Sequence, residues 1–198
     1  MPNKNQFIEF FVTFFYVGKI KYCPGTFGSL AAFPVGYLFL YFTVTYQLIF
    51  PFSNLTLAEA QFVTFFIIIL ILCFILFILG TYFSSLYIKH TRREDPKEIV
   101  IDEVVGQLLA MLLSFFSVVF VNHSGLTKYL NSQAIDIIFL FLLPFGLFRC
   151  FDILKPWPIN WLDKNIKGGI GVMLDDVVAA IFAAVAHYAI TFSLIDWI

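Results

Sequence analysis

Five acidic residues at the ends of long apolar stretches have the types and spacing for metal-assisted chemistry on a phosphate ester. They are Asp102, Glu103, Asp152, Asp175 and Asp176. An ionised carboxylate beside an apolar helix is costly unless it is paired or bound to a cation, and clustered carboxylates repel one another. Because Mg²⁺ prefers such oxygen ligands, the adjacent pairs at 102–103 and 175–176 predict a magnesium site that Asp152 could join. Gly106, one helical turn after Asp102, would leave room for the metal or a phosphate.

Basic residues close to the acids could bind phosphate oxygens. Arg149, Asp152 and Lys155 follow one another at intervals of three, so they can share one face of a helix. The prolines at 156 and 158 then end that helix. Arg149 and Lys155 would contact the phosphate, and Asp152 would bind the metal or position a neighbour. A membrane-surface ion pair beside a tryptophan anchor is the structural alternative for this segment.

Two glycine-rich segments could bring the backbone close to a phosphate group. The sequence Pro-Gly-Thr-Phe-Gly-Ser at residues 24–29 predicts a turn and a helix start, with Thr26 or Ser29 as the cap. The free N–H groups and the positive dipole end of such a start favour a phosphate, although an ordinary capped helix is the alternative. Glycines within 168–171 predict a tight turn before the second acid pair. The predicted phosphate-binding residues are Gly25, Thr26, Gly28, Ser29, Arg149 and Lys155.

The apolar stretches between these motifs predict a helical membrane protein. The chain has 198 residues, of which 61% are hydrophobic and only 13% are charged, and soluble domains of this length do not normally have such a composition. A helix needs about 20 apolar residues to span the hydrocarbon core, and the stretches 25–52, 62–83 and 104–121 contain no charge. Five spans are therefore predicted, at about 28–50, 62–83, 104–121, 130–148 and 177–196.

The remaining apolar segment, residues 7–17, is too short to cross a membrane and predicts an interfacial or packed helix. The predicted fold is thus all-α, a polytopic membrane helical bundle with about five transmembrane helices plus this short N-terminal helix, in a single domain of residues 1–198. Eleven of the twelve basic residues fall on one side of this layout. By the positive-inside rule that side is cytoplasmic, with the N-terminus inside, and the acidic motifs lie there too.

Other classes of protein fit the sequence less well. A nucleic-acid partner is not expected, because there is no long basic stripe and most aromatic residues lie in apolar stretches. An ion- or proton-coupled small membrane transporter is the alternative function, but it would carry acids within its spans, where Asp136 stands alone. A phosphatidyl-alcohol transferase would need an Asp-Gly/Ala-Arg-Gly-Asp-Asp pattern, which is absent. A purely structural membrane protein leaves the acid pairs unexplained, and a homo-oligomer stays open.

Four blocks of the sequence resemble the phosphatidylglycerophosphatase A family. They are PGTFGSLA at 24–31, DEVVG at 102–106, FRCFDILKPWP at 148–158 and GGIGVMLDD at 168–176. Each block is weak alone, but all four occur in the family's order between about residues 18 and 190. The resemblance implies a Mg²⁺-dependent phosphatase of the bacterial inner membrane that converts phosphatidylglycerophosphate to phosphatidylglycerol.

The resemblance and the acidic motifs together suggest a mechanism. The two acid pairs would hold one or two Mg²⁺ ions, which would neutralise the phosphomonoester and activate a water that attacks phosphorus in line. The two basic residues and the helix start at 25–29 would hold the non-bridging oxygens. A covalent intermediate through Thr26, Ser29 or an aspartate is less favoured, because no adjacent base is identifiable.

Overall fold

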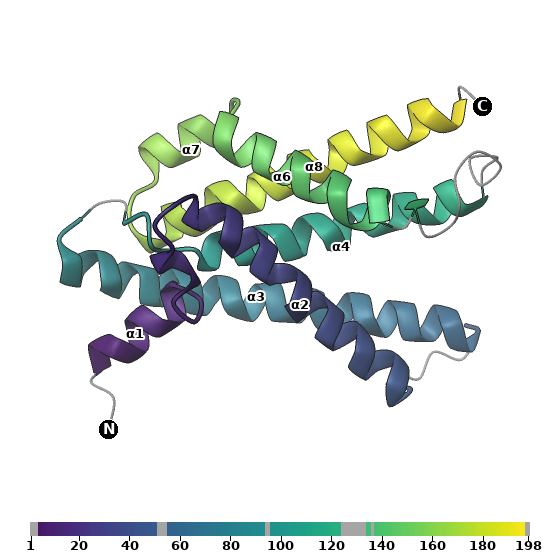
Figure 1. Cartoon of the computed structure of the whole chain (residues 1–198), viewed down its shortest axis with the longest axis horizontal. Coiled ribbons are helices and arrows are strands. Elements are labelled where there is room, and N and C mark those ends of the chain that lie inside the picture. Colours follow the sequence, from purple (N-terminus) through teal and green to yellow (C-terminus); the bar gives the residue numbers. More distant parts are fainter. Residues whose placement is uncertain (1–3, 51–54, 94–95, 124–133, 136, 197–198) are drawn as a thin grey trace.

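The protein is an elongated bundle of helices (Figure 1). A computed structural model describes residues 4–50, 55–93, 96–123, 134–135 and 137–196, and these residues contain no strand. The elements in chain order are α1 Lys4–Val12, η1 Val17–Lys19, α2 Pro24–Thr45, α3 Leu57–Thr91, α4 Ile101–His123, η3 Ile137–Leu142, α6 Leu143–Leu154, α7 Ile159–Asn165 and α8 Gly169–Asp196. Element η1 is a 3₁₀ turn and η3 is a π-helix. The all-α class predicted from the sequence is confirmed.

Within the described residues, four segments are long and apolar enough to cross a membrane, so the chain is a membrane protein. They are Pro24–Thr45, Glu59–Thr91, Ile137–Leu154 and Gly169–Ile195. Large apolar side chains on their outer surfaces, such as Phe74 and Val185, remain exposed, as expected for helices that contact lipid. The further predicted span, 104–121, falls within α4, whose side chains beyond Ser117 lie outside the described part of the chain. The number of five spans therefore stays a prediction.

Helices α2, α3 and α8 begin at least four residues before the predicted spans, for local reasons. Helix α2 begins at Pro24 rather than at residue 28, because proline suits the first turn of a helix. Helix α3 begins at Leu57 rather than at 62, because Thr56 and Glu59 form a capping box. Helix α8 begins at Gly169 rather than at 177, so Gly169 and Gly171 lie in the first turn of a helix, and only Gly168 is left for the turn before it.

The fourth predicted span, 130–148, ends earlier than the helix in the structure, which continues to Leu154. Element η3 and helix α6 together cover Ile137–Leu154, while residues 130–133 and 136, including the mid-segment acid, lie outside the described residues. Pro144 stands at the start of α6, directly after the π-helix. Since proline cannot donate a backbone hydrogen bond, a change of helix type at this point fits the sequence.

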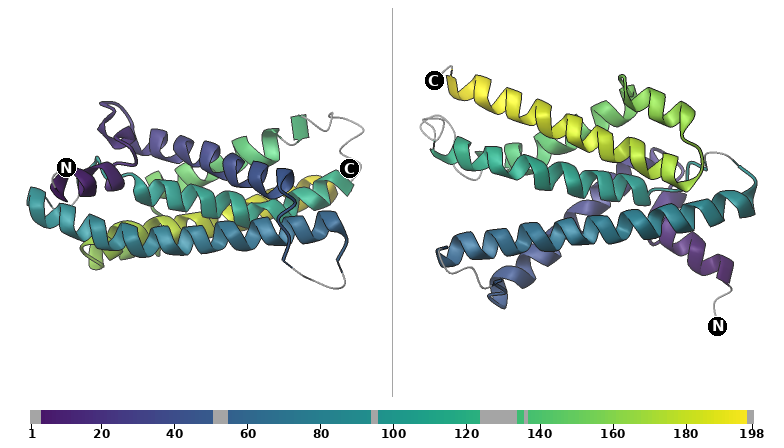
Figure 2. Two further views of the ribbon diagram at one scale, coloured as in Figure 1. Left: turned by 90° about the horizontal axis from the view of Figure 1, so that it is seen from below. Right: turned by 180° about the vertical axis from the view of Figure 1, so that it is seen from behind.

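Helix α4 is the central helix, and it packs against α2, α3, α6 and α8. Its most extensive contact is with α8, where Ala110 of α4 lies in one buried cluster with Ala179 and Ala183 of α8 and Phe148 of α6. Small residues at a helix crossing let the backbones approach closely in a membrane. The views in Figure 2 show α4 and α8 side by side along most of their length. The packing fixes the first turn of α4, which carries the first acid pair.

The N-terminal helix packs against α3. The ring of Phe83 in α3 lies 5.7 Å from that of Phe7 and 4.9 Å from that of Phe11, so the predicted short helix is a packed one. Three consecutive residues after α1, Phe14 to Tyr16, have positive φ. This left-handed turn costs non-glycine residues energy. Before the turn, Val12 O accepts a hydrogen bond of 3.0 Å from Val100 N, which ties the end of α1 to the residue before α4.

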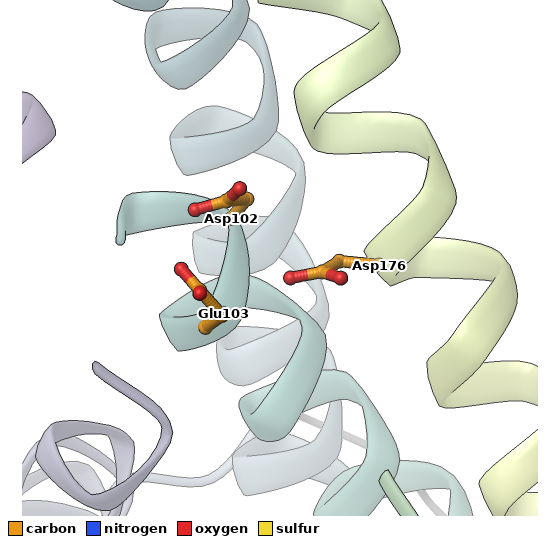
Figure 3. Close-up of side chains that lie close together, drawn as sticks. All are labelled: Asp102, Glu103 and Asp176. Carbon is orange, nitrogen blue, oxygen red and sulfur yellow. The ribbon is translucent and has the colours of Figure 1, made fainter. Parts of the chain in front are cut away.

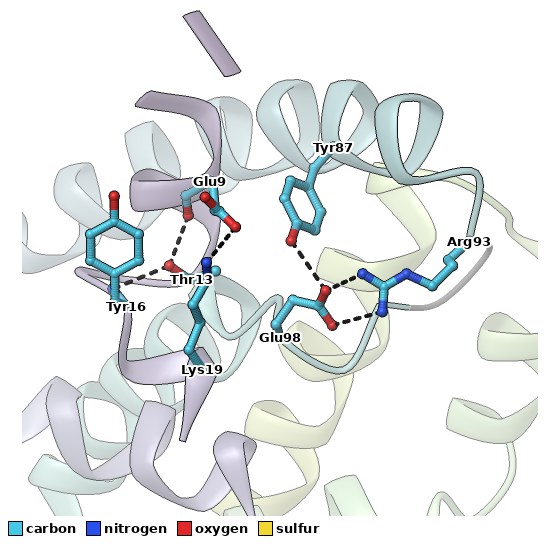
Figure 4. A network of polar contacts seen from close by, with 7 residues as sticks. All are labelled: Glu9, Thr13, Tyr16, Lys19, Tyr87, Arg93 and Glu98. Carbon is cyan, nitrogen blue, oxygen red and sulfur yellow. Dashed lines mark hydrogen bonds and ion pairs between the residues drawn. The ribbon is translucent and has the colours of Figure 1, made fainter. Parts of the chain in front are cut away.

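A polar network holds the connection between α3 and α4 in place (Figure 4). Glu98 accepts a hydrogen bond of 3.1 Å from Tyr87 of α3 and forms an ion pair with Arg93. Partial burial would raise the pKa of Glu98, but hydrogen bonds from its own backbone, Arg93 and Tyr87 outweigh this and lower the pKa. A side chain on Gly18 would meet the Glu98 carbonyl, so the N-terminal segment lies directly against this connection. These contacts fix the chain just before α4 begins.

Candidate active site

A cavity of about 480 Å³ lies at the end of the bundle where α2, α4 and α8 begin and α6 ends. Its walls come from the start of α2, the connection before α4, the first turn of α4, the segment from the end of α6 through α7, and the first turns of α8. Cavities of this size accommodate small ligands. All five acids that the sequence singled out line the cavity, and so do Gly25, Thr26, Arg149 and Lys155.

Asp102 and Glu103 on α4 and Asp176 on α8 form a cluster, which we call the three-acid cluster (Figure 3). One carboxylate oxygen of each residue lies within 4.8 Å of the others, and Figure 3 shows Asp176 directed from α8 toward the two acids of α4. Asp102 Oδ1, Glu103 Oε2 and Asp176 Oδ2 are buried and have no hydrogen-bond partner among the described residues. Buried carboxylate oxygens without partners are costly, so this cluster fits the requirements of a divalent cation.

Asp175, which the sequence also predicted as a metal ligand, lies outside the three-acid cluster. Successive residues of a helix point about 100° apart, so Asp175 and Asp176 face different neighbours. Lys155 donates hydrogen bonds to Asp175 at 2.7 Å and to Asp163 of α7 at 2.8 Å. Partial burial would lower the pKa of Lys155, but its bonds to the two carboxylates outweigh this and raise the pKa above the ordinary lysine value. Asp175 therefore ties α8 to the end of α6.

Arg149 and Asp152, one turn apart on α6, form an ion pair of 2.5 Å at the cavity wall. Their side chains are only 15% and 14% exposed, so solvent and salt weaken the attraction between the two charges only slightly. Arg149 also donates a hydrogen bond of 3.4 Å to Ser29 of α2, and its Nε is buried without a partner among the described residues. Arg149 thus keeps a donor that a bound anion could use.

The start of α2 has no side-chain cap, contrary to the prediction that Thr26 or Ser29 would supply one. The N-cap residue is Cys23, in a left-handed conformation, and the helix begins at the next residue. Thr26 and Ser29 are therefore inside the helix, where Ser29 donates a hydrogen bond of 3.0 Å to Gly25 O. Neither Ser29 nor Gly28 lines the cavity.

Two glycines beside the three-acid cluster allow helices to approach closely. A Cβ on Gly106 would lie 2.6 Å from ring atoms of Phe148 and 3.2 Å from Asp176 Cβ. The space beside Gly106 is thus taken by α6 and α8, and the expectation that a metal or phosphate occupies it is wrong. A Cβ on Gly25 would meet the carboxylate of Glu103, so this glycine lets α2 pass close to the cluster.

The glycines before the second acid pair bring α8 against α3. Gly168, with φ of 79°, supplies the turn that precedes α8. A Cβ on Gly169 would meet the Thr81 carbonyl of α3 and would lie 2.7 Å from Ser85 N. The amide of Gly169 donates a hydrogen bond of 3.1 Å to Ser85 Oγ. This contact positions the helix that carries Asp176.

Sequence reasoning did not single out four charged residues that line the cavity, namely Lys97, Asp163, Lys164 and Lys167. Asp163 pairs with Lys155 across eight residues and a change of helix, and no local spacing rule predicts such a pair. Gln107 was also missed as a candidate. It is fully buried one turn after Glu103, and its amide atoms have no partner among the described residues. Gln107 could have been found in the sequence as a polar residue inside an apolar span.

A buried serine–histidine pair also lies outside the cavity. Ser117 Oγ of α4 is 2.7 Å from His187 Nδ1 of α8, and His187 Nε2 is 2.8 Å from the Phe139 carbonyl of η3. His187 follows Asp176 by three helical turns, or about 16 Å of rise, and does not line the cavity. The pair therefore joins three helices and does not belong to the candidate active site.

Comparison with known proteins identifies the family. The family model described as Phosphatidylglycerophosphatase A matches residues 10–191. The chain belongs to the phosphatidylglycerophosphatase A family. The matched range includes the three-acid cluster, the ion pairs of Arg149 and Lys155 and every glycine discussed above. No solved structure matches the chain significantly.

Curated relatives agree with this family. Phosphatidylglycerophosphatase A of Haemophilus influenzae (strain Rd) is 33% identical over 175 residues, which cover 88% of this chain and 83% of the relative. Phosphatidylglycerophosphatase A of Escherichia coli (strain K12) is 29% identical over 167 residues, or 84% and 73% of the two chains. A Bacteroides thetaiotaomicron protein, provisionally named as a phosphatidylinositol-3-phosphatase, is 29% identical over 182 residues, or 90% and 92%. As a member of this family the chain is a phosphatase, that is, a phosphoric monoester hydrolase.

Proposed function

We propose that the protein hydrolyses phosphatidylglycerophosphate to phosphatidylglycerol and phosphate in phospholipid biosynthesis. The names of the two phosphatidylglycerophosphatase A relatives support this substrate. The observation that carries the proposal is the three-acid cluster at the base of a charged cavity, at one end of a bundle with membrane-length helices. A lipid whose acyl chains lie in the membrane can present its phosphate monoester at this end of the helices.

Mg²⁺ is the cofactor that we propose for this site. Asp102, Glu103 and Asp176 would hold the ion, because each contributes a buried oxygen without a partner among the described residues. Mg²⁺ accepts a small number of carboxylates and retains water in its remaining positions. When bound, it would supply charge neutralisation and Lewis-acid activation of the phosphate ester. Asp175, which Lys155 engages, would act by positioning that lysine.

The basic residues of the walls would bind and orient the phosphate. Arg149 is held by Asp152 at 2.5 Å and has an Nε without a partner among the described residues, while Lys155 is held between Asp163 and Asp175. Carboxylates that fix a cation in one orientation reduce the loss of side-chain freedom on binding an anion. Gly25 and Thr26 at the start of α2 border the same cavity, where the positive end of the helix dipole also favours an anion.

The site would face the cytoplasm from the inner membrane of a bacterium. Eleven of the twelve basic residues precede, follow or connect the spans on the side that carries the acidic motifs, and an excess of lysine and arginine is typical of cytoplasmic connections. The five basic residues that line the cavity belong to this set. The N-terminus would then be inside.

Phosphate release from phosphatidylglycerophosphate in detergent micelles tests the proposal. Asp176→Asn should reduce turnover by at least about 100-fold, because electrostatic stabilisation of a transferring phosphate is a large part of such catalysis. The protein should still insert into membranes, and EDTA should abolish activity of the unchanged protein until Mg²⁺ is restored. Glu59→Gln, an acid-to-amide change at the start of α3, serves as the matched control. Turnover in Asp176→Asn equal to that of the control would exclude this residue from the reaction.

A further inference from the structure

The charged side chains that line the cavity divide into paired and unpaired groups. Five basic and six acidic residues line it. Arg149 and Lys155 form ion pairs with carboxylates of the cavity wall. Lys97, Lys164 and Lys167 form no ion pair with any described residue, although acids without basic partners line the same cavity. We call these three lysines the rim lysines.

The unpaired groups of opposite sign are separated by depth. The oxygens of the three-acid cluster that have no described partner are buried, whereas all three rim lysines are exposed. Lys97 belongs to the connection before α4, while Lys164 and Lys167 belong to the end of α7 and the connection to α8. With the proposed Mg²⁺ bound to the three-acid cluster, the base of the cavity would attract one negative group, and the rim lysines at its mouth would attract another. The cavity therefore suits a ligand with two negative groups.

We propose that the rim lysines form a second anion subsite, which binds the phosphodiester of the lipid headgroup while the three-acid cluster engages the terminal phosphate. This inference rests on the proposed function, because phosphatidylglycerophosphate carries two phosphates separated by one glycerol. The monoester would lie at the buried end of the cavity and the diester at its exposed mouth, on the side of the acyl chains. An exposed ion pair between a lysine and the diester would change affinity by up to about fivefold.

The test compares substrate and half-substrate ligands in micelles of an uncharged detergent. The double variant Lys164→Gln with Lys167→Gln should raise KM for phosphatidylglycerophosphate by up to about 25-fold, or up to about fivefold per lysine, with a much smaller change in kcat. Phosphatidylglycerol, which carries only the diester, should inhibit the unchanged protein competitively, and its Ki should rise by a similar factor. The Ki of inorganic phosphate, which represents the reacting group, should change by less than about twofold. The matched control is Lys21→Gln with Lys89→Gln, two exposed lysines that do not line the cavity.

Each other outcome overturns the subsite. An equal rise in Ki for inorganic phosphate would assign the rim lysines to the reacting phosphate. Activation by phosphatidylglycerol would assign the rim lysines to a neighbouring lipid. An absence of competition by phosphatidylglycerol would show that they bind no lipid headgroup. An equal rise of KM in the control variant would show that the effect comes from the overall charge of the protein surface and not from the rim lysines. Failure of the unchanged protein to release phosphate from phosphatidylglycerophosphate would instead refute the proposed function, which distinguishes the two failures.

Discussion

Gly106→Ala is a substitution that the packing beside the three-acid cluster resists. Gly106 lies where α4 crosses α6 and α8, one turn after Asp102. A Cβ at this position would approach ring atoms of Phe148 to 2.6 Å and Asp176 Cβ to 3.2 Å. Phe148 is fully buried, so its ring has no open space into which it could turn. The helices must therefore separate.

The size of the effect follows from these distances. Ordinary contacts between carbon atoms lie at about 3.5–4.0 Å, so the ring and α4 must move apart by about 1 Å. Overpacking of this kind costs about 1–3 kcal/mol, partly offset by the gain of about 1 kcal/mol when alanine replaces glycine in a helix. A displacement of about 1 Å at a catalytic centre can reduce the rate about 100-fold. We therefore expect a large loss of activity with a small loss of stability.

Phosphate release and thermal unfolding in the same detergent would measure the two effects separately. Gly146→Ala is the control, because a Cβ on this α6 glycine would meet nothing within 4 Å, and it should stabilise the protein slightly. Adding Phe148→Leu to Gly106→Ala should recover part of the activity, because the smaller side chain removes the contact and the two changes are not additive. Full activity in Gly106→Ala alone would refute the argument that this crossing sets the distance between α4 and Asp176.

Three further predictions concern the supports of the site. Gly169→Ala should lower stability by about 1–3 kcal/mol in detergent unfolding, because its Cβ would meet the backbone of α3; a change no larger than that of Gly146→Ala would contradict this. Lys155→Met should lower the free energy of unfolding by about 1–3 kcal/mol, because it leaves Asp175 unpaired. Asp163→Asn, at the more exposed partner, should lower it by less than about 1 kcal/mol. Equal losses in the two variants would show that the burial of Asp175 is unimportant. The lowered pKa of Glu98 means that its contacts stabilise the fold above the ordinary pKa of 4.5 and are lost as the pH falls through the lowered value. Glu98→Gln should therefore lower the unfolding temperature at pH 7 and converge with the unchanged protein in acid, and a constant difference at all pH values would oppose this.

The sequence predicted the membrane class and the acids that meet, because these depend on composition and on the cost of isolated charge. Long apolar stretches can only be helices in a membrane, and acids at their ends need partners. Asp102, Glu103 and Asp176 do lie together, although they come from α4 and α8. The separation of Asp175 from this group was not predicted, since adjacent acids were treated as a unit although a helix directs them to different neighbours.

The roles of the glycines could not be predicted from the sequence. Gly106, Gly25 and Gly169 each face an atom of another helix, and a single sequence does not contain that information. Glycines that permit close packing and glycines that expose a turn to a ligand have the same local signature. The pairing of Lys155 with Asp163 could not be predicted either, because it depends on how α7 folds back after α6.

Three acids from two helices, Asp102, Glu103 and Asp176, would share one divalent cation. Crystals of the unchanged protein grown with Mn²⁺ in place of Mg²⁺ would test it most directly, because anomalous scattering locates manganese without any assumption about activity. We predict an anomalous peak within ligand distance of Asp102, Glu103 and Asp176, and its loss in Asp176→Asn. A peak bound elsewhere in the cavity, or full manganese occupancy in Asp176→Asn, would contradict the account.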